Sequence, residues 1–157
     1  MSKPKDAAPL MYMVPLKGEH AQQIKLTEHE APHTARFSLA ELKQLEGPHA
    51  VTVMLDGVPI LLMGAWQLWE NRAFIYSFYS QDATAERFGE LLTYVRAFLD
   101  GLPFRRLEMA IDVDFLPGHQ WVRSLGFERE AERMRFFHAD GRDCSLYSRI
   151  KEEVSHG

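Results

Sequence analysis

Residues 72–101, RAFIYSFYSQDATAERFGELLTYVRAFLDG, decide the fold that this sequence predicts. The run 73–79 is dominated by aromatic residues and isoleucine, which is typical of a strand. After the polar segment 80–84, apolar residues recur at the spacing of one buried helical face, at Ala85, Phe88, Leu91, Leu92, Val95, Phe98 and Leu99. A strand that leads directly into a helix N-terminus can bind an anion, because free N–H groups and the positive end of the helix dipole point the same way. The same pattern is also ordinary α/β construction, so it assigns no function alone.

Length and composition predict one globular domain. The chain has 157 residues, of which 46% are hydrophobic and 25% charged, which is enough apolar material for a core. We expect a flexible tail over residues 1–9, a single domain over 10–150 and a second tail over 151–157. A net charge of -4 argues against nucleic acid as a partner. The absence of a long apolar run or signal peptide argues against a membrane, and a single cysteine favours a reducing compartment, so we predict a cytoplasmic protein.

The rest of the chain alternates predicted strands and helices. We expect strands at 10–16, 50–55, 58–66, 105–113, 127–138 and 143–150, with Asp56-Gly57 as a hairpin turn. Short helices are expected from Gly18, from a capping box of Ser38 and Glu41, and over 117–125, where Gly126 ends the helix. The crossover helix between strands 73–79 and 105–113 predicts that these two strands are parallel. The order indicates an α/β fold, with about seven strands in a mixed sheet and flanking helices.

The segment 121–128, WVRSLGFE, resembles the helix-then-strand signature in the C-terminal half of the GCN5-related N-acetyltransferase (GNAT) family. The predicted terminal hairpin and the order of elements from Leu10 to Ile150 resemble that family too. The resemblance implies a GNAT-like fold, in which the fourth and fifth strands start paired and then splay apart. The sequence also resembles small GNAT-like proteins encoded by tailed phages.

The resemblance implies acetyl-CoA as co-substrate, inserted between the splayed strands. Its amide-bearing arm would contact the strand end, a backbone N–H near Tyr79 would polarise the thioester carbonyl, and the phosphates would lie over residues 82–89. The implied cofactor-binding residues are Phe78, Tyr79, Ser80, Thr84, Ala85, Arg87, Phe88 and Gly89. The chain departs from the family in this loop, where Thr84 and Glu86, or Glu86 and Phe88 in a second register, stand at the usual glycine positions.

Three residues are candidates for catalysis. Acetyl transfer to an amine needs a base, and family members often use a glutamate near the fourth strand, for which Glu70 is the candidate, although it more plausibly lies in a turn. His119 could relay protons with Asp112 or Asp114; the simpler interpretation is that Asp114 caps the helix and His119 is a partly exposed helix residue. Many family members carry a tyrosine acid at the position of Val122. The possible substitute acids here are Tyr76, Tyr79 and Tyr147, of which Tyr79 is favoured by position, although strand aromatics usually pack.

No metal site is predicted. His29 and His33 lie in the polar loop 27–36 with Pro32 between them, a spacing that would suit zinc only in a helix. In the family this loop borders the acceptor, and its Glu28 and Glu30 would suit a cationic amine. Cys144 is interpreted as a small hydrophobe, because no histidine is evidently paired with it.

Two functions remain open. The first is an acyl-CoA-dependent N-acyltransferase that uses a CoA thioester and an amine acceptor on a small molecule or protein. The second is a catalytically degenerate GNAT-fold protein that binds a protein partner, such as a host protein or a virion component, in the host cytoplasm if it is phage-encoded. An exposed hairpin edge could also support a homodimer.

Overall fold

The computed structural model describes residues 10–31, 37–83 and 85–152, so the tail expected over residues 1–9 lies outside the described residues. The chain forms two compact units. Unit 1 comprises residues 1–64 and 77–94, and unit 2 comprises residues 65–76 and 95–157. The expectation that residues 10–150 form one domain stays a prediction.

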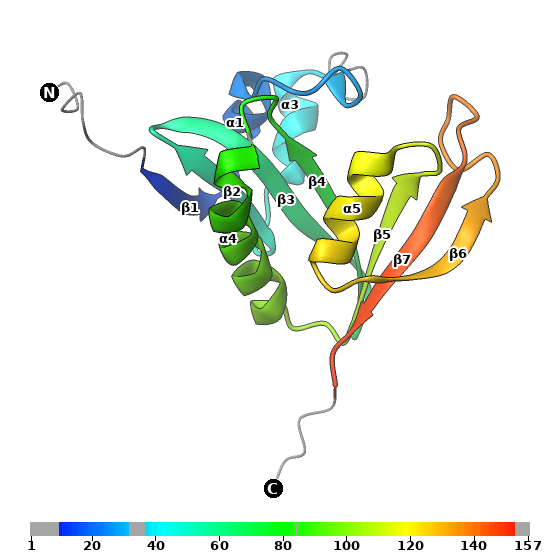
Figure 1. The fold of residues 1–157 in the computed structure, drawn as a ribbon. Coiled ribbons are helices and arrows are strands. Elements are labelled where there is room, and N and C mark those ends of the chain that lie inside the picture. Colours follow the sequence, from blue (N-terminus) through cyan, green and yellow to red (C-terminus); the bar gives the residue numbers. More distant parts are fainter. Residues whose placement is uncertain (1–9, 32–36, 84, 153–157) are drawn as a thin grey trace, which may run out of the picture. The chain divides into compact units, whose positions relative to one another are not determined.

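Unit 1 holds the N-terminal elements, which Figure 1 colours from blue to green. They are β1 (Met11–Pro15), α1 (Gly18–Gln23), α3 (Leu39–Leu42), the 3-10 helix η1 (Lys43–Leu45), β2 (Ala50–Leu55), the first part of β3 (Val58–Trp69), the end of β4 (Arg72–Tyr79), the 3-10 helix η2 (Ala85–Arg87) and the start of α4 (Phe88–Gly101). Unit 2 holds the remaining parts of β3, β4 and α4, followed by β5 (Arg106–Asp112), α5 (Leu116–Ser124), β6 (Glu128–Met134) and β7 (Cys144–Ile150).

The strands follow the order β1-β2-β3-β4-β5-β7-β6. β4 and β5 are parallel, whereas β1 with β2, β2 with β3, β5 with β7 and β6 with β7 are antiparallel. This arrangement confirms the predicted mixed α/β sheet of seven strands and the parallel pair formed through a helical crossover.

The pairing of β4 with β5 is short. It runs from Arg72↔Arg106 to Phe74↔Glu108, while β5 pairs with β7 from Arg106↔Ile150 to Asp112↔Cys144. β4 itself continues to Tyr79, beyond the end of this register, as expected for strands that start paired and then splay.

Local sequence signals set several boundaries as predicted. Asp56 and Gly57 both take positive φ angles, 50° and 81°, which the two-residue turn between β2 and β3 requires. The Ser38 side chain accepts from the Glu41 N–H, and the Glu41 carboxylate accepts from the Ser38 N–H, so the capping box is confirmed. Gly126 ends α5 with a φ of 88°.

Other predicted boundaries are wrong. β6 ends at Met134 rather than at residue 138, because Phe136 takes a φ of 54° and donates its N–H to the Asp143 carboxylate, which turns the chain. The α4 helix begins at Phe88 after the 3-10 turn η2, rather than at Ala85. Asp114 does not cap α5, whose N-cap is Phe115 with no side-chain cap bond.

Burial follows the position of each strand in the sheet. Residues 59–64 of the inner strand β3 are buried in succession, as expected for a strand covered on both faces. β6, with the sequence EREAERM, is mostly exposed at the sheet edge, where charged side chains oppose further strand pairing. Among the described residues, no helix has both the length and the apolar character needed to cross a membrane.

Candidate active site

The end of β4 and the segment after it lie within unit 1 and carry most of the predicted cofactor-binding residues. The Ser80 N–H donates to the Ile60 carbonyl of β3 at 2.8 Å, and the Gln81 N–H donates to the Lys25 carbonyl at 2.9 Å. Ser80 also forms an isolated antiparallel bridge with Leu26. The chain leaving β4 is therefore held between β3 and the segment that follows α1.

The Tyr79 N–H is the donor that the family resemblance implies for polarising a thioester. Successive N–H groups of a strand point to opposite sides, so this donor faces away from β3, to which the next N–H, of Ser80, is bonded. The Tyr79 N–H donates to Oε2 of Glu30 at 2.9 Å. A carboxylate of the same chain thus holds the predicted oxyanion donor.

Glu30 lies on a turn that is closed by its own N–H, which donates to the Thr27 carbonyl at 3.1 Å. Its side chain is buried, with only 9% of the residue exposed. Burial raises the pKa of Glu30 to about 7, while the hydrogen bond from Tyr79 lowers it by a smaller amount. A carboxyl group with this pKa exchanges its proton near neutrality, as a general base requires.

The Tyr79 hydroxyl is a poor proton donor in this environment. Burial, followed by the charge of Glu30, raises the pKa of Tyr79 to about 12. The side chain is half-buried at the end of β4. A phenol that holds its proton so strongly is a weak general acid at neutral pH, and the acid role of Tyr79 stays a prediction.

The start of α4 is open to solvent. A methyl group placed on Gly89 would meet no atom within 4 Å, and Phe88 is exposed. Arg87 lies 3.7 Å from the Glu90 carboxylate, and the exposed Ala85 precedes it in η2. The predicted residue Thr84 lies outside the described residues. This helix start offers backbone N–H groups and one cation to an anionic ligand.

Acidic side chains flank the same segment. Asp82 and Glu86 are both exposed. The Asp82 N–H donates to the Ser80 hydroxyl oxygen at 2.9 Å. These carboxylates oppose the binding of a phosphate through like-charge repulsion.

A hollow of about 380 Å³ borders the turn that carries Glu30. Six of its seven lining residues are apolar, and two of them, Leu26 and Ala31, flank the turn; the others are Ala21, Gln22, Ile24, Phe37 and Leu42. Its lining is suited to the apolar part of a small ligand.

The other catalytic candidates lie in unit 2. Glu70 is exposed in the turn between β3 and β4, as its position in the sequence indicated. His119 is buried rather than partly exposed, and its Nε2–H donates to the carbonyls of Asp112 and Val113 at 3.1 and 2.9 Å. Its Nδ1 lies 2.6 Å from the Tyr147 hydroxyl. These contacts use both ring nitrogens, and the partners are two backbone carbonyls and a hydroxyl group. The proton relay of His119 with Asp112 or Asp114 stays a prediction.

The interpretation of Cys144 also changes. The Cys144 Sγ lies 3.2 Å from Nε2 of His138, so a histidine is paired with it across the turn between β6 and β7. No periodic pattern in the sequence indicates this pair, because the intervening residues form an irregular turn. The sequence likewise indicates only that Glu30 is one acidic residue of a polar loop. Its burial depends on residues far away in the chain, so the neighbouring residues do not predict it.

The sequence matches no protein-family model and no curated protein. Solved structures with a similar fold include Ard1 from Thermoplasma volcanium, with 13% identity, a TM-score of 0.70, and coverage of 91% of this chain and 99% of that one. They also include yncA from Salmonella typhimurium, solved with its cofactor acetyl-CoA, with 16% identity, a TM-score of 0.66, and coverage of 92% and 96%. A GNAT-family acetyltransferase from Bacillus anthracis gives 9% identity, a TM-score of 0.68, and coverage of 91% and 96%. At these identities the likeness shows the GNAT fold.

Proposed function

We propose that this protein is an acyl-CoA-dependent N-acyltransferase that transfers an acetyl group to an amine and uses Glu30 as its general base. The single observation that carries the proposal is the buried Glu30 carboxyl group, bonded to the outward-facing N–H of Tyr79. The GNAT fold supports it, because the end of β4 and the start of α4 are where the family resemblance places the CoA thioester.

Glu30 suits the role of base better than the candidates chosen from the sequence. An attacking amine must lose a proton, and a carboxylate with a pKa of about 7 can accept it at neutral pH. Because the Glu30 carboxylate is bonded to the Tyr79 N–H, it would lie next to the carbonyl carbon of a thioester that binds the same donor. Glu70, by contrast, is exposed in a turn.

The residues present fit a CoA thioester in two respects. Tyr79 supplies a backbone donor directed away from β3, and the open start of α4 supplies N–H groups and Arg87 for the phosphates. When bound, acetyl-CoA supplies an activated acyl group. Protonation of Glu30 weakens its hold on the Tyr79 N–H, because a neutral carboxyl group is a weaker acceptor than a carboxylate. Near pH 7 both forms are populated. The neutral form would release the Tyr79 N–H to the thioester carbonyl, and once the thioester holds that donor, Glu30 would lose its proton to solvent and accept the proton of the attacking amine as a carboxylate.

The acceptor we propose is a cationic amine with an apolar body, on a small molecule or a protein. Glu28 is exposed on the same turn as Glu30, and the apolar hollow borders this turn. A protonated amine would be attracted by the carboxylates, and its apolar part would bury surface in the hollow. The reaction would take place in the cytoplasm.

The second candidate is a catalytically degenerate GNAT-fold protein that binds a protein partner, such as a phage-encoded modulator of a host protein. A specific observation favours it. The Tyr79 N–H already has an acceptor from the same chain, and Asp82 and Glu86 lie where phosphates would bind. Such a protein would not bind CoA.

Calorimetric titration of acetyl-CoA and free CoA separates the two candidates. The first candidate predicts micromolar binding to the wild type, and loss of binding in Gly89→Glu, where a new carboxylate meets the phosphates. Gly47→Glu is the matched control, because it adds the same charge at another open position in unit 1. No heat and no thermal stabilisation at millimolar CoA would exclude the enzyme.

Steady-state kinetics then test the base. Glu30→Gln keeps an oxygen for the Tyr79 N–H but cannot accept a proton. We expect kcat to fall about 100-fold or more. We also expect the rise of the wild-type rate near pH 7 to disappear, with acetyl-CoA binding retained. An unchanged pH profile in Glu30→Gln would show that Glu30 is not the base.

A further inference from the structure

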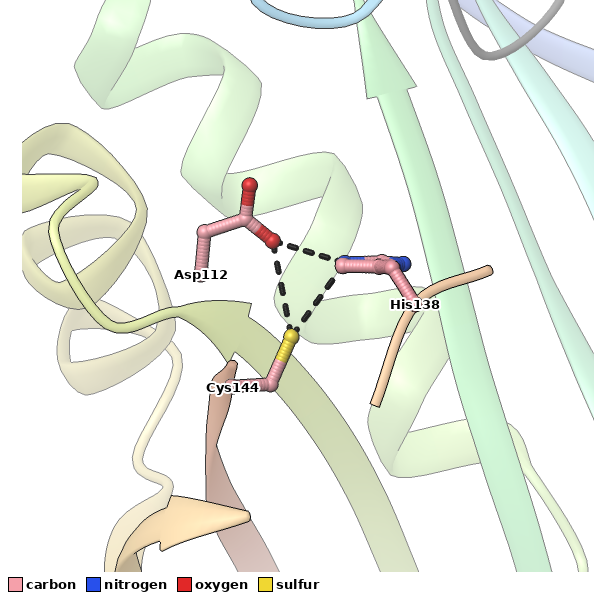
Figure 2. Close-up of side chains that lie close together, drawn as sticks. All are labelled: Asp112, His138 and Cys144. Atoms are coloured by element: carbon pink, nitrogen blue, oxygen red, sulfur yellow. Dashed lines mark hydrogen bonds and ion pairs between the residues drawn. The ribbon is translucent and has the colours of Figure 1, made fainter. Parts of the chain in front are cut away.

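Three potential metal ligands meet in unit 2, and none of them belongs to the proposed acyltransferase site. Asp112 ends β5, Cys144 begins β7, and His138 lies in the turn between β6 and β7 (Figure 2). Asp112 and Cys144 are a registered cross-strand pair, so their side chains lie on the same face of the sheet. The turn brings His138 to them, because the His138 N–H and the Phe137 N–H both donate to the Arg142 carbonyl.

The three ligand atoms converge on one point. His138 Nε2 lies 2.7 Å from Asp112 Oδ1 and 3.2 Å from Cys144 Sγ, and the sulfur lies 3.4 Å from the same carboxylate oxygen. Figure 2 shows the carboxylate and the thiol facing the same ring nitrogen. A Cys–His–Asp relay would instead need the carboxylate on the other ring nitrogen. The arrangement therefore does not activate the thiol as a nucleophile.

We propose that Asp112, His138 and Cys144 bind one zinc ion. Thiolate, imidazole and carboxylate together select zinc over magnesium and calcium, which prefer oxygen ligands alone. In a tetrahedral zinc site, bonds of about 2.0–2.3 Å place ligand atoms about 3.3–3.7 Å apart. The two distances from sulfur are already close to this range, and the His138–Asp112 pair must open by roughly 0.6 Å.

Arg142 orients the carboxylate for this role. Its Nη1 donates to Asp112 Oδ2 at 2.6 Å, which leaves Oδ1 directed at His138 and Cys144. Its Nε donates to Asp140 at 2.8 Å, so a second carboxylate offsets the charge of the guanidinium group. Hydrogen-bonded outer partners of this kind fix the orientation of metal ligands.

Zinc binding to this site would release the Cys144 thiol proton to solvent, because the thiolate is the ligand. Three protein ligands leave a fourth coordination position for water or another donor. The Cys144 side chain is buried and that of His138 is 31% exposed, so the ion would enter from the side of His138.

The test uses the full chain after removal of metals with a chelator. Competition with a chromophoric zinc chelator should give one zinc per wild-type chain. Cys144→Ser and His138→Gln should each bind at least about 100-fold more weakly. His49→Gln, a histidine substitution in unit 1, should bind like the wild type.

Cobalt(II) provides a second readout. The wild type should show a thiolate-to-cobalt charge-transfer band that is absent in Cys144→Ser. Circular dichroism of each variant reports whether the fold is kept, and His138→Gln changes only a partly exposed turn residue. Failure of the wild type to bind zinc, equal affinity in His138→Gln, or a cobalt spectrum without the thiolate band would each overturn the proposal.

Discussion

Two buried glutamates of this protein, Glu30 in unit 1 and Glu108 in unit 2, have opposite electrostatic environments. Glu30 is 9% exposed and Glu108 is 3% exposed. Burial raises the pKa of both, but Glu108 also accepts hydrogen bonds from Arg72 and Arg106, and these bonds lower its pKa below the usual value. Glu30 accepts a hydrogen bond from the Tyr79 N–H, which lowers its pKa less than burial raises it, so the pKa of Glu30 rises to about 7.

The difference shows what each carboxyl group contributes. An ionised, arginine-paired Glu108 joins β4 and β5 where the two strands are in register, so it stabilises the sheet. Among the residues that the structure describes, no arginine or lysine pairs with Glu30, so its ionisation costs free energy. A buried group that is kept at such a cost is a candidate for function rather than for stability.

The largest expected effect is on Glu108. Glu108→Gln removes the charge that pairs two guanidinium groups whose side chains are 35% and 28% exposed. We expect the free energy of unfolding to fall by about 2–3 kcal/mol, below the range for fully buried pairs because both cations keep some water. Urea unfolding at pH 7 measures the change, with the exposed Glu128→Gln as control. A loss no larger than that of the control would mean that the pair does not stabilise the sheet.

At alkaline pH, Glu30→Gln should change the free energy of unfolding in the opposite direction to Glu108→Gln. The folded-state pKa of Glu30 is about 7, above the ordinary value of 4.5, so its contribution to stability is full below the lower value and is lost as pH rises through 7. The stability difference between variant and wild type should therefore move by about 2 kcal/mol in favour of the variant between pH 5 and pH 8.

Urea unfolding at the two pH values checks this second prediction. Glu28→Gln, an exposed neighbour on the same turn, should leave the pH dependence of the wild type unchanged. If Glu30→Gln keeps the wild-type pH dependence, Glu30 does not have a raised pKa, and the contrast with Glu108 disappears.

The smallest effect is expected at Glu130, the second carboxylate on Arg106. Hydrogen bonds from Arg106 and from the Ser148 hydroxyl lower the pKa of Glu130 to about 2, but its side chain is 40% exposed. Glu130→Gln should lower the free energy of unfolding by only about 0.5 kcal/mol, because solvent screens exposed pairs. The same urea assay in low and high salt measures it, and a loss as large as that of Glu108→Gln would show that exposure does not separate the two carboxylates.

The parts of the fold that depend on neighbouring residues could be predicted. The Asp56-Gly57 turn, the Ser38 capping box and the Gly126 helix end are each specified by a few adjacent side chains and their backbone preferences. The parallel pairing of β4 with β5 followed from the helix between them. Turns without a repeated pattern could not be predicted. For this reason the strand expected over 127–138 is longer than the observed β6.

The candidate site was predicted only in part. The sequence identified the strand end and the helix start, because hydrophobic periodicity changes between them. It did not identify Glu30 as a buried group, since its partner Tyr79 lies 49 residues away in the chain. The cluster of Asp112, His138 and Cys144 was missed for a similar reason, because Asp112 reaches Cys144 through strand pairing.

By itself, then, the sequence determined the order of strands and helices and the mixed α/β class. Short-range preferences and the 2.0 and 3.6 residue periods of strands and helices carry that information. Only the tertiary structure decided which carboxyl groups are buried with a cation and which without one. Burial and electrostatic partners arise from residues far apart in the chain, and they set the pKa values on which catalysis and metal binding depend.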